Sequence, residues 1–205
     1  MKNRIILASQ SPRRKYILGL IGFKPIVKVS NCDESKIKEK DPEKLVKLLS
    51  ALKAQDVAKD CKEGDIIVAA DTVVSVDDKI LGKPKSEKEA DKMLKTIKNR
   101  KHIVYTGVTI IKKGDSAVTG KSGKKPSKDI IKTFCEKSIV TVADLTQAEI
   151  DEYIASREPM DKAGAYGVQG LFGRHIPKVQ GDFFNVMGLP AHKTYEAIKQ
   201  MLKEG

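Results

Sequence analysis

Hydroxyl and guanidinium groups gather just after the first apolar run of the chain. The run Ile5 to Ala8 is typical of a buried strand, and the residues that follow it are Ser9, Ser11, Arg13 and Arg14. Ser11 suits the N-cap of a helix, and Pro12 suits its first position. Free N–H groups and the helix dipole attract negative charge there, so the segment predicts a phosphate or polyphosphate site. The alternative is an ordinary helix start with solvated arginines.

Asp71 is the main candidate for acid–base chemistry. It follows the apolar run Ile66 to Ala70, which we interpret as a strand that ends at this aspartate. Ligands of α/β sheets collect at the carboxyl ends of strands. A carboxylate there can act as a general base or bind a divalent metal. The alternative is a turn aspartate that caps the backbone of Thr72 or Val73.

Two lysines are candidates for neutralising phosphate charge. Lys83 stands between Gly82 and Pro84, and the proline restricts the lysine to extended backbone. Lys53 lies on a long helix that we expect to start at Asp41, and it can act only if that helix borders the site. The alternatives are an ordinary loop lysine and a lysine whose stem covers apolar surface while its charge stays in water.

Two further clusters combine charge with small residues. Asp33 and Glu34 are adjacent carboxylates, which suit Mg²⁺ or Mn²⁺ together with substrate phosphates. Asp161 and Lys162 begin a glycine-rich stretch in which Gln169 can read the edge of a base with one donor and one acceptor. As an alternative, the glycines serve turns only.

Composition narrows the classes of protein that this chain can be. Its 205 residues are 40% hydrophobic and 32% charged, as expected for a globular protein with one sizeable domain or a two-lobed one. Its net charge of +12 favours polyanionic partners, and the alternative is that the excess lysines form solvated helix faces. The three cysteines form neither a disulfide framework nor a zinc motif. We find no signal peptide, no membrane-length apolar run, no Walker A loop and no nucleophile elbow, and we expect a cytoplasmic protein.

Alternating strands and helices through the first 110 residues predict an α/β domain. The expected strands are 4–8, 26–29, 66–70, 73–77, 103–111 and 137–142. The expected helices are 12–21, one from residue 41, one from 86 to 97, one from 146 to 155, and one after residue 190. The buried stripe of the second helix is expected to comprise Leu45, Leu48, Leu49, Leu52 and Ala54. Tyr195, Ile198 and Leu202 are expected to face inward from the last helix. The Lys-rich stretch 113–129 is expected to be a surface loop or hairpin tip.

In sequence, these segments resemble the Maf family of nucleoside triphosphate pyrophosphatases. The similarity extends from near one terminus to near the other. The matching segments are Leu7 to Arg14, Asp33-Glu34, Lys53-Ala54, Ala70 to Val74, Gly82 to Pro84, Thr106 to Val108, Asp161 to Tyr166 with Gln169-Gly170, and Asn185 to Pro190.

The resemblance implies an elongated α/β fold like that of inosine triphosphatases. In this fold a mixed sheet is flanked by helices and an active-site cleft lies between two lobes. One domain would span 1–205, with 113–129 as a basic loop insertion. The implied reaction is hydrolysis of the α–β phosphoanhydride, and Arg13, Thr72 and Gln169 match the branch that acts on dTTP and UTP. A link to septum formation and a homodimer are also implied; membrane binding and specific nucleic-acid binding are not.

The residues and this resemblance together give a hypothesis for the role of each candidate residue. The catalytic residues would be Asp71, which activates water, Lys83, which helps to hold the triphosphate, and Glu34, which binds Mg²⁺ or Mn²⁺. The substrate-binding residues would be Ser9, Ser11, Arg13, Arg14, Lys53, Thr72, Asp161, Lys162 and Gln169. Among these, Thr72 and Gln169 are expected to face the pyrimidine.

Two departures from the family pattern keep a second hypothesis open. The 113–129 stretch is longer and more basic than is usual in the family. Asp182 replaces a small residue and could disturb its loop or repel phosphate. The alternative is a regulatory protein that binds nucleotides or nucleic acid without turnover.

Overall fold

The structure is a computed structural model that describes residues 3–114 and 128–203. Within these residues, seven strands form one mixed sheet in the order β2-β1-β3-β5-β6-β7, and β4 pairs with β3. The strands are β1 (Ile5–Leu7), β2 (Ile26–Val27), β3 (Ile66–Val76), β4 (Lys79–Leu81), β5 (Lys101–Lys112), β6 (Ile130–Thr141) and β7 (Lys178–Gln180). The α-helices are α1 (Pro12–Leu20), α2 (Pro42–Ala58), α3 (Glu87–Ile97), α4 (Gln147–Ala155), α5 (Phe183–Met187) and α6 (Ala191–Lys203). Short 3₁₀ helices are η1 (Glu34–Lys36), η2 (Glu158–Asp161), η3 (Ala163–Ala165) and η4 (Leu171–His175).

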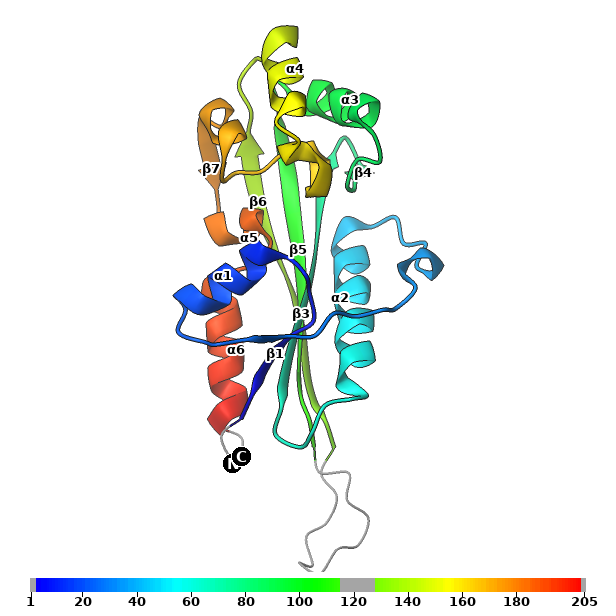
Figure 1. Cartoon of the computed structure of the whole chain (residues 1–205), viewed down its shortest axis with the longest axis vertical. Coiled ribbons are helices and arrows are strands. Elements are labelled where there is room, and N and C mark those ends of the chain that lie inside the picture. Colours follow the sequence, from blue (N-terminus) through cyan, green and yellow to red (C-terminus); the bar gives the residue numbers. More distant parts are fainter. Residues whose placement is uncertain (1–2, 115–127, 204–205) are drawn as a thin grey trace, which may run out of the picture.

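The long strands β3, β5 and β6 connect two lobes, as Figure 1 shows. One lobe carries β1, α1, α2 and α6, and the other carries β4, β7, α3 and α4. Each lobe has its own hydrophobic core: Leu7, Val68 and Ile198 belong to the first, and Leu94 and Tyr153 to the second. The predicted α/β fold with an elongated mixed sheet is therefore confirmed.

β3 differs from the expected strand in a way that matters for Asp71. It continues without a break from Ile66 to Val76, so Asp71 lies within the strand and not at its end. The strand that ends is its neighbour β1, whose last residue, Leu7, pairs with Val68. Beyond that point this edge of β3 has no β1 partner, while β5 still pairs with the other edge. The chain leaving β1 therefore opens a space beside Asp71.

The helix faces that pack on the sheet are only partly those predicted. Leu48 of α2 is 47% exposed, whereas Ser50 is fully buried and its hydroxyl hydrogen-bonds to Thr109 of β5 at 2.9 Å. The buried residues of α2 are Val46, Leu49, Ser50, Ala54, Val57 and Ala58. On α6, Tyr195 and Leu202 are more than one-third exposed. The buried residues of α6 are Ala191, Thr194, Ala197, Ile198 and Met201.

The stretch 113–129 joins β5 to β6, which begins seven residues earlier than expected. These strands are antiparallel neighbours that pair from Lys112 with Ile130 onward. An ion pair of 3.0 Å between Lys113 and Asp129 closes the described part of the connection. The expected loop or hairpin tip otherwise lies outside the described residues.

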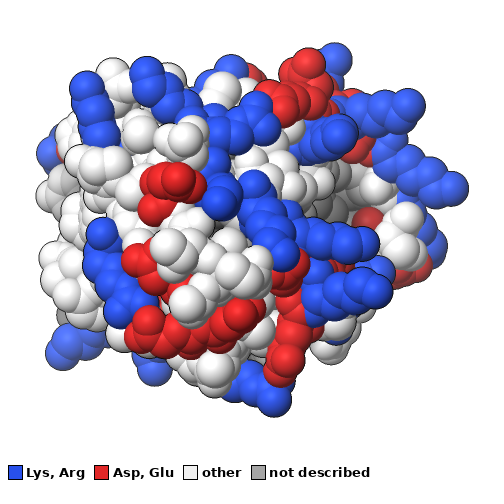
Figure 2. All heavy atoms as spheres, turned by 90° about the horizontal axis from the view of Figure 1, so that it is seen from above, with Lys and Arg blue, Asp and Glu red and all other residues white. Residues whose placement is uncertain are grey.

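Basic and acidic side chains are interspersed on the end of the molecule that carries α3 and α4 (Figure 2). Several of them are paired: Arg157 with Glu87 at 2.6 Å, and Arg174 with Glu152 at 2.8 Å. These are exposed pairs, which typically contribute under about 1 kcal/mol each. We therefore interpret the lysine and arginine side chains of this face as solvated surface charges.

Gly107 of β5 pairs with Asp71 of β3 in the antiparallel register. Because Gly107 has no side chain, α2 can approach the sheet closely at this point. A Cβ at Gly107 would lie 2.3 Å from the carbonyl oxygen of Val46. Lys53 lies seven residues after Val46, on the same face of α2. The absence of a side chain at Gly107 thus sets the depth at which Lys53 meets the sheet.

We expect Gly107→Ala to lower the free energy of unfolding by about 1–3 kcal/mol, because the added methyl group must displace helix backbone. Denaturant unfolding measures this change. Gly19→Ala is the matched control, since a Cβ at this helical glycine meets nothing within 4 Å. It should leave stability unchanged or raise it by up to about 1 kcal/mol. Equal effects of the two substitutions would contradict the close-packing explanation.

Candidate active site

A cleft of about 550 Å³ lies beside β3, in the space beyond the end of β1. Its walls come from both lobes. Every residue that the sequence assigns to the site lines it: Ser9, Ser11, Arg13, Arg14, Glu34, Lys53, Asp71, Thr72, Lys83, Asp161, Lys162 and Gln169. The structure thus brings together side chains that are up to 160 residues apart in the chain.

The turn between β1 and α1 has the predicted geometry. The Ser11 hydroxyl caps α1 by accepting a hydrogen bond from the backbone N–H of Arg14 at 3.4 Å, and Pro12 is the first helical residue. The Ser9 hydroxyl accepts from the backbone N–H of Ser11 at 3.2 Å. The start of α1 therefore faces the cleft with a fixed backbone.

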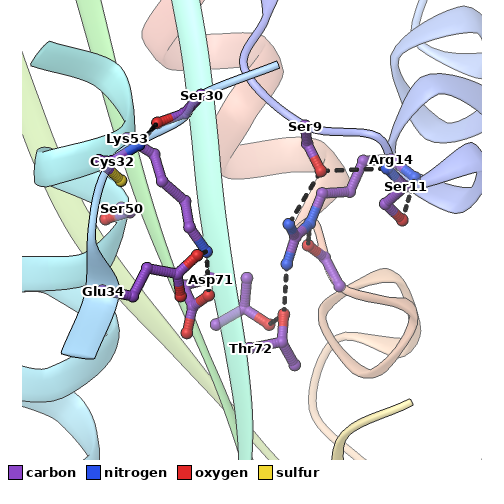
Figure 3. A network of polar contacts seen from close by, with 12 residues as sticks. Ser9, Ser11, Arg14, Ser30, Cys32, Glu34, Ser50, Lys53, Asp71 and Thr72 are labelled. Carbon is purple, nitrogen blue, oxygen red and sulfur yellow. Dashed lines mark hydrogen bonds and ion pairs between the residues drawn. The ribbon is translucent and has the colours of Figure 1, made fainter. Parts of the chain in front are cut away.

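Arg14 is held at the cleft by three side-chain hydrogen bonds, which Figure 3 shows from close by. Its Nε donates to the Gly188 carbonyl at 2.9 Å, one Nη to the Ser9 hydroxyl at 3.2 Å and the other to the Thr72 hydroxyl at 3.1 Å. Burial lowers the pKa of Arg14, and the negative charges of Asp71 and Glu34 oppose that shift. An arginine remains charged in such surroundings, so the cleft contains a fixed cation.

Gly188 can present its carbonyl to Arg14 because it ends α5 with a φ of 110°. This left-handed conformation favours glycine. No chemical role was expected for the Asn185 to Pro190 segment beyond its match to the family pattern. Its contribution depends on a contact with a residue 174 positions away, which no local pattern reveals.

Lys53 lies between the two carboxylates of the site (Figure 3). Its Nζ is 2.6 Å from Asp71 Oδ1 and 3.2 Å from Glu34 Oε1. The Lys53 and Asp71 side chains are only 14% and 15% exposed, whereas that of Glu34 is 50% exposed. The condition set by the sequence, that the helix of Lys53 borders the site, is met.

Arg13 makes an ion pair across the cleft. It extends from α1 to Asp161 of η2, with 2.9 Å between its Nη1 and Oδ2. Asp161 also accepts from Lys162 at 2.7 Å. One carboxylate therefore links cations of both lobes at this wall of the cleft.

Lys83 and Gln169 are exposed side chains that line the cleft. Within the described residues, neither side chain makes a hydrogen bond or an ion pair. The backbone beside Lys83 is nevertheless fixed, because the Gly82 carbonyl accepts from Gly164 N–H at 3.0 Å. Both side chains are free to bind a ligand.

Asp182 does not face the cleft. It caps the N-terminus of α5, where its carboxylate accepts from the backbone N–H groups of Phe184 at 2.7 Å and Asn185 at 3.3 Å. The expectation that this carboxylate disturbs its loop or repels phosphate is therefore not supported. Its charge instead stabilises the start of a short helix.

Tyr166 lines the cleft and rests on His102, a contact that the sequence did not reveal. The Tyr166 hydroxyl lies 2.7 Å from His102 Nε2, and His102 is only 2% exposed. Burial lowers the pKa of His102 from 6.5 to about 4. Below pH 6.5 the unfolded chain gains a proton at this histidine that the folded chain does not take up.

We therefore expect His102 to lower the free energy of unfolding as pH falls from 6.5 to 4, by at most about 1.4 kcal/mol per pH unit. His102→Gln keeps a hydrogen-bonding group beside Tyr166 but does not titrate, so this part of the slope should vanish. Denaturant unfolding of both proteins across that range measures the difference. Parallel pH profiles would contradict the assignment.

The carboxylates of the cleft suit a divalent metal that is held partly by the protein and partly by the phosphates of a bound ligand. Glu34 and Asp71 approach the same ammonium group from different segments. No group of three or more His, Cys, Asp or Glu side chains converges within residues 3–114 and 128–203. This donor set suits a divalent metal that takes one or two carboxylates and completes its shell with phosphate oxygens and water.

The fold and the cleft define an α/β protein with a cationic, carboxylate-bearing pocket suited to a polyphosphate ligand. More particularly, the chain belongs to the Maf family, since the family model described as Maf-like protein matches residues 4–201.

The chain is similar to several curated proteins named dTTP/UTP pyrophosphatase. The relative from Lachnoclostridium phytofermentans is 46% identical over 197 residues, which cover 96% of this chain and 94% of that protein. The relative from Clostridium perfringens is 44% identical and covers 96% of each chain. A solved structure of the Staphylococcus aureus Ham1 protein aligns with a TM-score of 0.47 at 15% identity, over 99% of each chain. In the described part of the chain, no helix has the length and apolarity needed to cross a membrane.

Proposed function

We propose that this chain hydrolyses the α–β phosphoanhydride of dTTP and UTP to the nucleoside monophosphate and pyrophosphate. One observation carries the proposal: a shielded carboxylate, Asp71, shares a cleft with the fixed cations Arg14 and Lys53. The names of relatives that are 41–46% identical over nearly the whole chain support it.

In this proposal, the cations of the cleft bind the triphosphate. Arg14 and Lys83 contact phosphate oxygens, and the start of α1 adds the positive end of its helix dipole. Lys53 orients Asp71 and offsets part of the negative charge that phosphates bring into the cleft. Asp71 accepts a proton from water as that water attacks the α-phosphorus. The bond from the α-phosphorus to the bridging oxygen breaks, and pyrophosphate leaves.

Glu34 would hold Mg²⁺ or Mn²⁺ together with phosphate oxygens. When bound, the metal supplies positive charge that stabilises the phosphates in the transition state. Glu34 is half exposed, so its carboxylate can turn from Lys53 toward an incoming metal–nucleotide complex.

Pyrimidine choice is assigned to the wall that carries Gln169. In one orientation its amide pairs with the carbonyl and N–H groups of a uracil or thymine edge and leaves polar groups unpaired against cytosine. Selectivity therefore requires that the bound nucleotide fixes this orientation of the amide. Arg13 supports this wall through its ion pair with Asp161. A role in septum formation and a homodimer remain predictions from the family resemblance.

A nucleotide panel tests the proposed function. With Mg²⁺ or Mn²⁺ present, release of pyrophosphate should be fastest from dTTP and UTP. Equal rates on dTTP, UTP and CTP would remove the specificity claim. Binding without hydrolysis of any nucleotide, or affinity for random DNA that falls steeply with salt, would favour the regulatory alternative instead.

A further inference from the structure

Behind Arg14, a chain of hydrogen bonds extends from the cleft into the interior. Thr72 of β3 and Thr106 of β5 are direct partners in the antiparallel register, and their hydroxyl oxygens are 3.0 Å apart. Thr106 then donates to the backbone carbonyl of Asn185 at 3.0 Å. Thr72 lines the cleft, whereas Thr106 and Asn185 are fully buried and do not.

The direction of these bonds follows from the number of protons available. A carbonyl only accepts, so the single hydroxyl proton of Thr106 points to Asn185. The proton between the two threonines must then come from Thr72. Arg14 only donates, so Thr72 accepts from it at 3.1 Å. The hydrogen bonds therefore all donate in one direction, from Arg14 to Thr72, from Thr72 to Thr106, and from Thr106 to the Asn185 carbonyl.

Asn185, at the buried end of this series of hydrogen bonds, is itself held by two hydrogen bonds. The Asn185 amide nitrogen donates to the Val104 carbonyl at 3.1 Å and to the Ser138 hydroxyl at 3.0 Å. The same segment, α5 with its last turn, supplies the Gly188 carbonyl that accepts from Arg14 Nε. The guanidinium of Arg14 is therefore connected to the α5 segment twice, directly through Gly188 and indirectly through Thr72 and Thr106.

This arrangement leaves a defined part of Arg14 for a ligand. Of its five N–H groups, one each donates to Gly188, Ser9 and Thr72. One N–H remains on each terminal nitrogen. Two such donors are enough to bind two oxygens of one phosphate group.

We propose that Thr106 is a positioning residue for polyphosphate binding. It fixes Thr72 as an acceptor and so holds Arg14 with its two remaining N–H groups toward the phosphates. Thr72 contributes through Arg14, because its own proton is already donated to Thr106. The inference rests on the proposed function in taking Arg14 as a phosphate ligand.

Thr106→Val tests this role, since valine keeps the shape of threonine and removes the hydroxyl. With Mg²⁺ present, calorimetry should show affinity for inorganic tripolyphosphate falling by about tenfold, as for one lost hydrogen bond that orders a charged group. Thr106→Ser restores the hydroxyl and should bind within about twofold of the wild type, a difference of under 0.5 kcal/mol.

Thr109→Val is the matched control. Thr109 is also fully buried on β5, but its hydroxyl contacts Ser50 at 2.9 Å and Thr133 at 3.0 Å, away from the cleft. It should lose as much thermal stability as Thr106→Val and keep its tripolyphosphate affinity. Equal losses of affinity in both variants would overturn the proposal, and so would unchanged affinity in Thr106→Val.

A double-mutant cycle with Arg14→Lys separates positioning from general structure. Lysine cannot use the Thr72 acceptor in the same fork, so Thr106→Val should have little further effect in that background. An undiminished tenfold effect there would contradict the role assigned to Thr106. Tripolyphosphate binding does not depend on hydrolysis, so this result is independent of the nucleotide panel. Absence of tripolyphosphate binding by the wild type would also overturn the inference.

Discussion

Asp71→Asn should lower kcat for pyrophosphate release by about 10²–10⁴-fold, the usual contribution of a positioned general base. The amide keeps the size of the carboxylate and can still accept from Lys53, so the cleft should keep its shape. It cannot take a proton from water at neutral pH. Nucleotide affinity, measured by calorimetry, should change little.

Asp60→Asn is a suitable control for the loss of one carboxylate. Asp60 is 74% exposed and, among residues 3–114 and 128–203, its carboxylate pairs with Lys28 at 3.4 Å, outside the cleft. It should retain wild-type kcat. Near-wild-type turnover in Asp71→Asn would remove Asp71 from its assigned role.

The second large effect is expected from Arg14→Met, which should lower kcat/KM by about 10²-fold. Two charge-assisted hydrogen bonds to phosphate are lost, and each contributes about 1.5–3 kcal/mol. Part of that loss is offset because methionine relieves the desolvation of a buried charge. Arg14→Lys keeps the charge without the fork and should fall between methionine and wild type.

Thermal unfolding separates a loss of binding from a loss of structure in these variants. Arg100→Met is the control, because it makes the same replacement at a surface arginine. Arg100 pairs with Asp77 at 2.6 Å. Its kinetics should match the wild type. Unchanged kcat/KM in Arg14→Met would show that the triphosphate binds elsewhere.

Local chemistry made much of the site predictable from the sequence. Ser11 and Pro12 mark the start of α1 whatever surrounds them, and the structure confirms this turn. The candidate residues were identified by charge, hydroxyl content and neighbouring glycine or proline, and all of them line one cleft. The family resemblance connected segments that local patterns alone could not bring together.

What the sequence did not predict depends on contacts between distant segments. The apolar run before Asp71 looks like a complete strand, but β3 continues because β5 pairs with it through Ser75. Gly107 has a role only because the backbone of α2 passes over it. Asp182 was expected to repel phosphate, but its carboxylate accepts a hydrogen bond from the backbone of α5. In each case the deciding partner lies far away in the chain or in the backbone.

Hydrolysis of dTTP in water enriched in ¹⁸O identifies the phosphorus atom that water attacks. Because water attacks the α-phosphorus in the proposed reaction, the label should appear in dTMP and be absent from pyrophosphate. Mass spectrometry of both products gives the answer in one reaction. Label in pyrophosphate, or release of orthophosphate in its place, would rule out attack at the α-phosphorus.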